Sequence, residues 1–568
     1  MPRLPLPPLS RIEPSEIPAD FMAALAVCIL AVPQGLAYAT IAGLPPVMGL
    51  YAAAIPPIVG SLFRSSRHVV AGPTNALSLL VWAAVAGVSD DPVSVALTLA
   101  LMVGVMQVAA GILRLGSVVD YISGPVVLGY ITGAGVLIGI GQLHNVTATT
   151  GPRGNLLTTV QGWIPVLDEA STLAVGMTAG TVGVVILVRF ISARLGRRIP
   201  AAVTAMITAL IVNVALGLED RGLRVLSDLS PIPSGFAMPE VPRLADLGTL
   251  LPFAVACTVL SLVESSAVAR SIAARTGQRL DPSTEFVGQG MANLAAGFWG
   301  GYPVSGSLSR SALNERGGAR SRLSGILSGV LMIGVLLVFG PTLDHTPIAS
   351  LAGLLIVVAW DLVDAPRILR TMRASWGDAL AFVVTVLATW IFSLDMAIYL
   401  GVAFSLVSFL QRARLLVVRE MVHDEEGQWQ ERPADEGSDD GRMPHVRVLQ
   451  IEGPLFFGAM GELLSSLEDV MRNRDVLAVV LRLKRAQGMD ATAADALAGM
   501  AEAAKQRGQS LILVGLSPDM LEVLKRSDAA LAFTPEHLLL ANKTRFVALN
   551  EACRLASDYV ANHAPSPD

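Results

Sequence analysis

The chain has 568 residues, of which 53% are hydrophobic and only 15% are charged, whereas soluble proteins carry about 25% charged residues. This composition excludes an ordinary soluble enzyme or binding domain. The net charge of −5 argues against nucleic-acid binding, and three widely spaced cysteines suggest neither a disulfide framework nor a metal site. Apolar runs near 20 residues, the length of a membrane-crossing helix, recur from Asp20 to Val417. We expect a polytopic α-helical membrane protein.

Fourteen candidate spans follow an acidic N-terminal segment, residues 1–19, that shows no signal-peptide cleavage site. Several of the spans, notably the third and the tenth, are too short to cross a bilayer as continuous helices. The spans cover residues 20–41, 44–62, 73–88, 93–113, 118–142, 172–192, 199–217, 248–271, 284–300, 306–317, 321–341, 348–364, 378–393 and 395–417.

Arginines gather in every second connection between these spans. Because cytoplasmic loops of membrane proteins are enriched in basic residues, this alternation predicts that both termini are cytoplasmic and that the number of spans is even. The basic connections hold Arg64 and Arg67; Arg114; Arg194, Arg197 and Arg198; Arg270, Arg275 and Arg279; Arg316, Arg320 and Arg322; Arg367, Arg370 and Arg373; and Arg412 and Arg414.

The third and tenth spans share one design. Each opens on a break of Gly, Pro, Ser or Thr residues, at 72–75 and at 306–309. Paired short, interrupted segments in two halves of a chain indicate a transporter site. Seven spans separate the two members, and because seven is odd, the second half is inverted relative to the first. We therefore expect 7+7 inverted repeats whose two half-helices meet near the midplane.

The tenth span also carries the features of an anion site. It lies in residues 300–321, GGYPVSGSLSRSALNERGGARS. A short helix that begins at Gly306 or Ser307 has free N–H groups at its N-terminus, where the positive end of the helix dipole also lies. Arg310 adds a full positive charge one turn later. The alternative is an ordinary loop that joins two spans.

Glu264 lies inside the eighth span, and an acidic residue in a membrane span is a functional candidate by default. It follows Gln34 of the first span by 230 residues, nearly the 233 residues that separate Gly306 from Pro73. A proton on Glu264 would remove a charge that repels an incoming anion, and the ionised form would balance Arg310 in the empty site. The alternative is a purely structural pair with an arginine.

The character of the chain changes after Met421. Residues 423–442 hold eight acidic residues against two arginines and predict a solvated loop. Strands and helices alternate beyond it, which predicts a small cytoplasmic α/β domain and divides the chain into residues 1–19, 20–417 and 418–568. The predicted strands are 446–451, 476–483 and 510–515, and the predicted helices are 459–473, 491–507 and one from Pro518.

Three stretches carry a family resemblance: VPQGLAYATIAGLPPVMGLY at 32–51, GPTN at 72–75, and residues 300–321. They resemble the signatures of the SulP anion permeases, and the terminal domain is similar to a STAS domain. The resemblance implies 7+7 inverted repeats with a moving core and a gate, a homodimer, and transport of small anions such as sulfate, bicarbonate, chloride or dicarboxylates. It places the chain in the cell (inner or plasma) membrane.

The anion contacts implied by the resemblance come from three spans. A polar pair four residues apart shares one face of the first span, a Ser-Arg pair opens the tenth, and backbone N–H groups at the break of the third complete the cradle. These residues are Gln34, Tyr38, Ser309, Arg310, Thr74 and Asn75.

Glu264 matches an acid that is also present in sodium-coupled bicarbonate members of the family. There a threonine that helps to hold the ion follows four residues later, whereas this chain has Val268, which offers no oxygen to a hard cation. We therefore favour proton coupling through Glu264. The leading hypothesis is a proton-coupled importer of a small oxyanion, sulfate first, that works by elevator-like alternating access.

Other functions remain open at this point. The same fold could carry bicarbonate or a dicarboxylate such as fumarate or succinate, because dipoles and one arginine suit any compact anion. A second alternative is a regulatory or sensor protein with little transport, whose STAS domain binds a cytoplasmic partner. No intramembrane Ser/His/Asp, HExxH or paired-carboxylate constellation appears, so we expect no enzyme and no cofactor. Thr492 matches the phosphorylatable position of STAS antagonists, but we favour a helix N-cap there.

Overall fold

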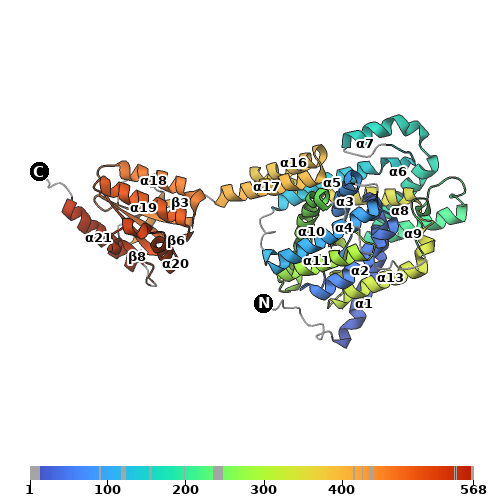
Figure 1. Cartoon of the computed structure of the whole chain (residues 1–568), viewed down its shortest axis with the longest axis horizontal. Coiled ribbons are helices and arrows are strands. Elements are labelled where there is room, and N and C mark those ends of the chain that lie inside the picture. Colours follow the sequence, from blue (N-terminus) through green and yellow to red (C-terminus); the bar gives the residue numbers. More distant parts are fainter. Residues whose placement is uncertain are drawn as a thin grey trace. The chain divides into compact units, whose positions relative to one another are not determined.

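The computed structural model describes residues 13–88, 91–116, 123–151, 156–196, 199–233, 247–413, 416–424, 426–433, 441–542, 544 and 546–563. The chain divides into two compact units, Met1–Leu406 and Val407–Asp568, and each is described by itself (Figure 1).

The first unit is built of helices, and each of the fourteen predicted spans contains one of them. In chain order they are α1 (Ile17–Ile41), α2 (Pro46–Phe63), α3 (Asn75–Val88), α4 (Pro92–Ile112), α5 (Gly124–Gly141), α6 (Leu143–Thr147), α7 (Leu156–Trp163), α8 (Thr172–Leu195), α9 (Ala201–Leu216), α10 (Leu247–Thr276), α11 (Pro282–Phe298), α12 (Leu308–Arg316), α13 (Leu323–Leu343), α14 (Ile348–Leu362), α15 (Ala365–Ala374), α16 (Trp376–Ile391) and α17 (Leu394–Ala413).

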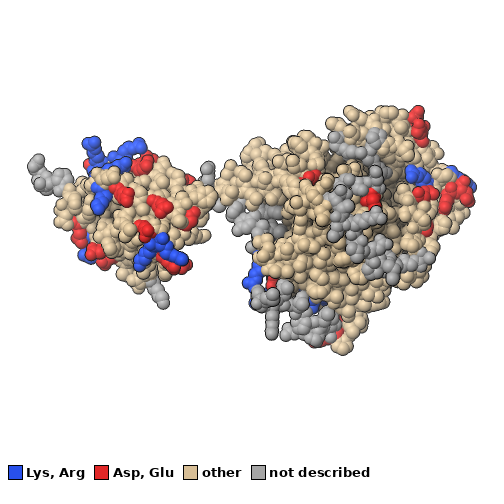
Figure 2. All heavy atoms as spheres, viewed as in Figure 1, with Lys and Arg blue, Asp and Glu red and all other residues tan. Residues whose placement is uncertain are grey.

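The lengths and the outer surface of these helices suit a bilayer. Within the described residues, eight helical segments are long and apolar enough to cross a membrane, and four shorter apolar helices accompany them. Large apolar side chains such as Ile186, Phe190, Val338 and Phe339 are more than half exposed, and Figure 2 shows a largely uncharged surface on this unit. Such a surface is stable against lipid rather than water. The protein is a multi-pass membrane protein, and the count of fourteen crossings stays a prediction.

The packing of the helices repeats across the two halves. Helix α2 packs against α13 and its counterpart α11 packs against α4; likewise α1 contacts α12, and α10 contacts α3. We call α1–α4 with α10–α13 the core bundle. A second group pairs α5 with α16 and α8 with α14, and we call α5, α8, α9, α14 and α16 the gate bundle. This exchange of partners between halves is the packing expected for two related repeats.

Glycines allow the two repeats to approach closely within the core bundle. A Cβ atom on Gly104 of α4 would lie 2.7 Å from the Leu294 nitrogen of α11, and one on Gly290 would lie 2.6 Å from the Val108 nitrogen of α4. Side chains at either position would therefore force the helix backbones apart.

The second unit is an α/β domain. Its six-stranded sheet has the order β4-β3-β5-β6-β7-β8, with parallel pairing from β5 to β8 and antiparallel pairing of β3 with β4 and β5. The predicted strands and helices after residue 446 are all present. The elements are β3 (Val417–His423), β4 (Trp429–Pro433), β5 (Val446–Leu455), α18 (Met460–Arg472), β6 (Ala478–Met489), α19 (Ala491–Gln506), β7 (Ser510–Leu516), α20 (Pro518–Arg526), β8 (Leu538–Leu540) and α21 (Val547–His563).

The predicted solvated loop at 423–442 is partly wrong. Residues 429–433 of this stretch form β4, which makes a hairpin with β3 at the edge of the sheet. Residues 425 and 434–440 lie outside the described residues. The hairpin is held by Glu420 of β3, whose side chain is only 3% exposed and pairs with three arginines. Arg442 and Arg432 lie 2.8 and 3.0 Å from its carboxylate, and Arg447 lies 3.5 Å away.

Candidate anion site

The two short half-helices begin side by side because the segments before them form a small sheet. Strand β1 (Ala71–Gly72) precedes α3, strand β2 (Ser305–Gly306) precedes α12, and the two strands are antiparallel, with Ala71 opposite Gly306. Corresponding segments of the two halves therefore run in opposite directions, as expected for inverted repeats. Two further bonds fix the junction, from the Ser307 amide to the Val70 carbonyl (3.0 Å) and from the Val70 amide to the Ser311 hydroxyl (2.9 Å).

Helix α12 begins at Leu308, within two residues of the predicted start. Ser307 is its N-cap, and the Ser307 hydroxyl accepts a hydrogen bond from the Arg310 amide. The amides of Leu308 and Ser309 have no acceptor in the described part of the chain. At an N-terminus of a helix such N–H groups, together with the helix dipole, attract an anion.

Arg310 is the central charged residue of this junction. It is 1% exposed, and its guanidinium donates to the Pro73 carbonyl at the break before α3. Two more donors, Nε and Nη1, are buried without an acceptor among the described residues. Gly72 makes room for this group, since a Cβ atom there would lie 2.5 Å from Nη1. A buried guanidinium with unused donors is costly unless a further acceptor binds it.

Glu264 of α10 lies on the other side of the same junction. Its carboxylate accepts a hydrogen bond from the Thr74 hydroxyl at 3.1 Å. No ion pair joins Glu264 to Arg310 in the described structure, where the guanidinium donates to the Pro73 carbonyl. Glu264 is thus tied to the break before α3.

Helix α1 supplies the remaining predicted contacts. The Gln34 amide donates to the Ser309 hydroxyl at 3.3 Å, and Tyr38, one turn later, is 7% exposed. Both side chains line a small cavity of about 60 Å³ between α1 and the gate bundle. Asn75 plays a local role, since its side-chain oxygen accepts from the Ala76 amide at 2.8 Å. The structure therefore brings together Gln34, Tyr38, Thr74, Glu264, Ser309 and Arg310 around one junction.

The same small cavity has a charged wall that sequence reasoning missed. Arg189 of α8 lines it and makes a bidentate pair with Asp361 of α14, with distances of 2.9 and 2.5 Å. Both side chains are about half exposed, at 50% and 45%. Both residues fall inside predicted spans. A charged residue within a membrane span is a functional candidate, as argued for Glu264, so Arg189 and Asp361 are candidates as well.

A buried network of polar side chains holds the backbone next to β2 in place. The Asn293 side chain accepts a hydrogen bond from the Val304 amide at 2.7 Å and donates one to the Val304 carbonyl at 3.0 Å. The Gln289 side chain donates to the same carbonyl. Gln289 accepts in turn from Arg64, which is 1% exposed and donates to the Val69 carbonyl. Arg64, one of the arginines that mark a basic connection in the sequence, is therefore a buried structural residue.

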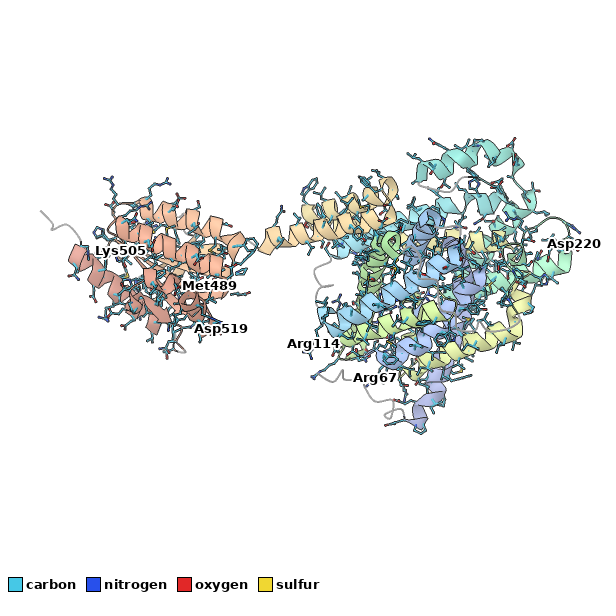
Figure 3. All side chains as sticks on the ribbon, in the orientation of Figure 1. Arg67, Arg114, Asp220, Met489, Lys505 and Asp519 are labelled. Atoms are coloured by element: carbon cyan, nitrogen blue, oxygen red, sulfur yellow. The ribbon has the colours of Figure 1, made fainter. Side chains whose placement is uncertain are left out.

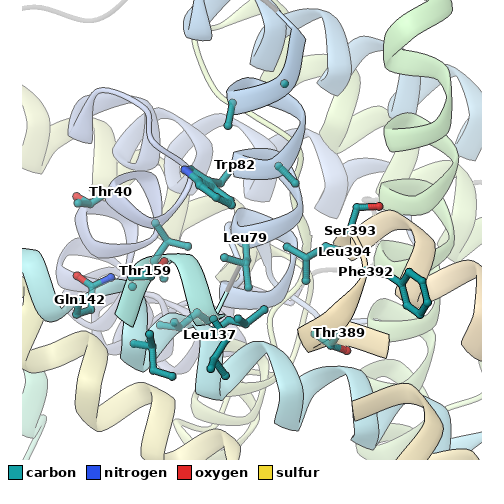
Figure 4. A pocket seen from close by; sticks show the side chains of 18 of the residues that line it. Thr40, Leu79, Trp82, Leu137, Gln142, Thr159, Thr389, Phe392, Ser393 and Leu394 are labelled. Atoms are coloured by element: carbon teal, nitrogen blue, oxygen red, sulfur yellow. The ribbon is translucent and has the colours of Figure 1, made fainter. Parts of the chain in front are cut away.

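The larger cavity of Figure 4, about 400 Å³, has a different character. It lies between α1, α3, α5, α7, α16 and α17, and its lining includes Leu79, Trp82, Leu137 and Phe392. No charged side chain of the described residues lines it. It therefore offers a small oxyanion no side-chain positive charge among the described residues.

In the second unit the predicted cap at Thr492 is wrong. The N-cap of α19 is Asp490, whose carboxylate accepts from the Ala493 amide at 2.7 Å and from the Phe457 amide at 2.9 Å. Thr492 is exposed within the first turn of the helix. Its role as a phosphorylation switch stays a prediction.

A family model described as the sulfate permease family matches residues 17–385, and a STAS domain model matches residues 441–537. Among curated proteins, "Putative sulfate transporter YvdB" of Bacillus subtilis is 31% identical over 518 residues, covering 89% of this chain and 93% of the relative. "Sulfate transporter 4.1, chloroplastic" of Arabidopsis thaliana is 27% identical and covers 95% of this chain and 80% of its own length.

A solved structure shows the same fold. The overall structure of SLC26A9 superposes with a TM-score of 0.87 at 18% sequence identity, covering 98% of this chain and 93% of the other. The match includes helical and α/β parts, so the two-part architecture predicted from the sequence is confirmed.

Proposed function

Because the chain belongs to the sulfate permease family, we propose that it is a secondary active transporter that imports a small inorganic oxyanion, sulfate first, together with protons. The observation that carries this proposal is Arg310, a buried guanidinium with two unused donors beside two half-helix N-termini. The relatives are named as transporters, in agreement with the expectation that the chain is not an enzyme.

The site attracts an anion by three additive effects. Arg310 supplies a full charge in a region of low dielectric constant, the two helix dipoles add partial positive charge, and the free amides of α12 supply directed donors. Ser309 and Gln34, which bond each other in this structure, can each turn a polar group toward the same position. None of these groups is specific for one oxyanion.

Glu264 is the residue that we assign to coupling. When ionised it repels a dianion near Arg310, and when protonated it becomes a hydrogen-bond donor, so proton binding and anion binding favour each other. Val268, one turn along α10, packs in an apolar cluster with Val69 and Ile272. The Val268 side chain offers no oxygen ligand to sodium, which supports the proton as the coupled ion.

The arrangement of helices supports an elevator-like movement. The junction of the half-helices belongs to the core bundle, while the opposite wall of the small cavity, with Val185, Arg189 and Leu354, belongs to the gate bundle. Movement of the core against the gate would carry the anion across with its polar contacts intact. A homodimer, cytoplasmic termini and a protein partner at the STAS domain are parts of the same proposal.

Uptake into proteoliposomes tests this function. Purified full-length protein would be reconstituted, and labelled sulfate uptake measured with an inward proton gradient, with a sodium gradient, and with neither. We expect uptake that follows the proton gradient and ignores sodium. Unlabelled bicarbonate, fumarate and chloride would run as competitors. Absence of sulfate flux under every gradient would contradict the sulfate assignment, and competition would then identify the alternative anion.

Replacing Glu264 by glutamine is expected to preserve sulfate binding and to remove the dependence of uptake on pH. Glutamine keeps a hydrogen-bond acceptor for Thr74 but cannot exchange a proton. The measurement is sulfate uptake at a series of external pH values, beside a direct binding assay. A normal pH profile in this variant would exclude Glu264 from coupling.

Replacing Asp361 by asparagine is expected to lower the KM for sulfate by a few-fold, because it leaves Arg189 unpaired beside the cavity of Gln34 and Tyr38. Arg189→Gln should raise the KM by a similar factor, since a half-exposed charge contributes about 1 kcal/mol. The double variant Arg189→Asp with Asp361→Arg, in which the two charges are exchanged, is the control for a purely structural role. If this double variant has a normal KM while both single variants do not, the pair only holds the helices together and does not contact the anion path.

A further inference from the structure

A second, larger charged cavity lies in the first unit, apart from the anion junction. Its volume is about 780 Å³, within the range of about 300–1,000 Å³ that holds whole small-molecule ligands. Three loops and the start of the chain line it: the α2–β1, α10–α11 and α12–α13 connections, and residues before α1. We call it the arginine cavity, after Arg67, Arg279, Arg320 and Arg322, which line it.

Three of these arginines have no partner in the described structure. Arg67, Arg279 and Arg320 are exposed, and no hydrogen-bond acceptor or ion-pair partner of their side chains occurs among the described residues. Arg322 differs, because it is 8% exposed and donates to the carbonyls of Ser61, Leu62 and Arg64. Arg322 therefore anchors the cavity, and the other three offer unused guanidinium groups.

The backbone that carries these arginines is held rigidly. Gln278 joins two loops, as its side chain accepts from the Arg67 amide (3.2 Å) and donates to the Ser65 carbonyl (2.8 Å). Asp20, fully buried in α1, accepts from the amides of Arg320 and Ser321 at 2.7 and 3.1 Å. Fixed loops with unpaired charges form a preorganised site, so a ligand would not have to order them.

We propose that the arginine cavity binds a ligand that carries two or more phosphate groups. Each guanidinium can bind a phosphate through two parallel N–H···O bonds, and three free groups from separate loops suit several phosphates rather than one ion. Two carboxylates, those of Glu13 and Glu16, also line the cavity and reduce its positive charge. The ligand is a soluble polyphosphate or the headgroup of a lipid with more than one phosphate.

Basic loops are common at the cytoplasmic ends of membrane helices, where they set orientation without binding anything. Arg114 provides the comparison within this chain. It is exposed, it lies at the same end of the first unit as Arg67 in Figure 3, and it does not line the cavity. If these arginines only set the orientation of the helices in the membrane, replacing Arg67 and replacing Arg114 should have the same effect on ligand binding.

The test is calorimetric titration of purified full-length protein, in neutral detergent, with inorganic tripolyphosphate, against sulfate at equal ionic strength. We expect Arg67→Gln, Arg279→Gln and Arg320→Gln each to weaken tripolyphosphate binding about tenfold, and Arg114→Gln to leave it unchanged. The double variant Glu13→Gln with Glu16→Gln should bind several-fold more tightly. Arg310→Gln should retain binding, which separates this cavity from the transport site.

Nanodiscs separate the two sources of the ligand. Protein in phosphatidylcholine alone would be compared with protein in phosphatidylcholine containing cardiolipin, a lipid with two phosphates. Loss of tripolyphosphate binding in cardiolipin identifies a lipid headgroup as the occupant, and unchanged binding identifies a soluble ligand. The proposal is overturned if wild-type protein does not bind tripolyphosphate in detergent, or if Arg67→Gln and Arg114→Gln change binding equally.

Discussion

Replacing Arg310 by glutamine is expected to reduce anion uptake by at least about 30-fold, because the loss of a buried, hydrogen-bonded charge costs a bound anion about 2–5 kcal/mol. The fold should not suffer. The guanidinium is 1% exposed with two donors unpaired, so its removal also relieves a desolvation cost. We expect a thermal unfolding midpoint equal to or above that of the wild type, measured beside labelled-sulfate binding.

Arg64 is the matched control for this experiment. It is equally buried, at 1% exposed, and it lies in the same core bundle, but its donors are used by the carbonyls of Gly60 and Val69 and by Gln289. Arg64→Gln should therefore lower stability by about 1–3 kcal/mol for the unpaired acceptors that remain. Normal sulfate binding by Arg310→Gln, at full stability, would show that the anion binds elsewhere.

Replacing Glu420 by glutamine should destabilise the second unit by about 3–5 kcal/mol, since removing one partner of a buried ion pair is strongly destabilising. Arg432, Arg442 and Arg447 would lose the buried carboxylate that all three contact. Hydrogen exchange of the full-length protein measures the effect, and faster exchange should appear first in β3 and β4.

Glu452→Gln is the control on the same sheet. Glu452 pairs with Arg485, whose side chain is 54% exposed, and a pair of this kind contributes about 0–1 kcal/mol. The double variant Glu420→Gln with Arg442→Gln should recover part of the loss. Equal exchange in the Glu420 and Glu452 variants would mean that the arginine cluster does not hold the hairpin.

Hydropathy and turn residues were sufficient to predict most of the architecture. The apolar runs located a helix in every predicted span, and the alternation after residue 446 located strands β5, β6 and β7 and helices α18, α19 and α20, but not β8 or α21. The sheet-edge strand β4 was missed because its residues, WQERP, are mostly polar, as is usual for an edge strand exposed to solvent. Local composition cannot separate such a strand from a loop.

The site was only partly predictable for a different reason. Residues that belong to a motif, such as Glu264 and Arg310, were named from the sequence, but their partners depend on contacts between distant segments. Strands β1 and β2 have two residues each and pair across more than two hundred positions, so no local signal marks them. Whether an arginine is buried, like Arg64, or exposed, like Arg67, is likewise decided by the fold.

The pairing of β1 with β2 also constrains how the protein is made. Ribosomes synthesise the first half long before Ser305 and Gly306 exist, so until then the backbone groups of Ala71 and Gly72 have no partner strand. Unpaired backbone groups are unfavourable in lipid, which implies that the break before α3 stays hydrated or shielded during insertion. The binding junction is therefore assembled late, after the second break has entered the membrane, and a chain that stops before residue 305 cannot complete it.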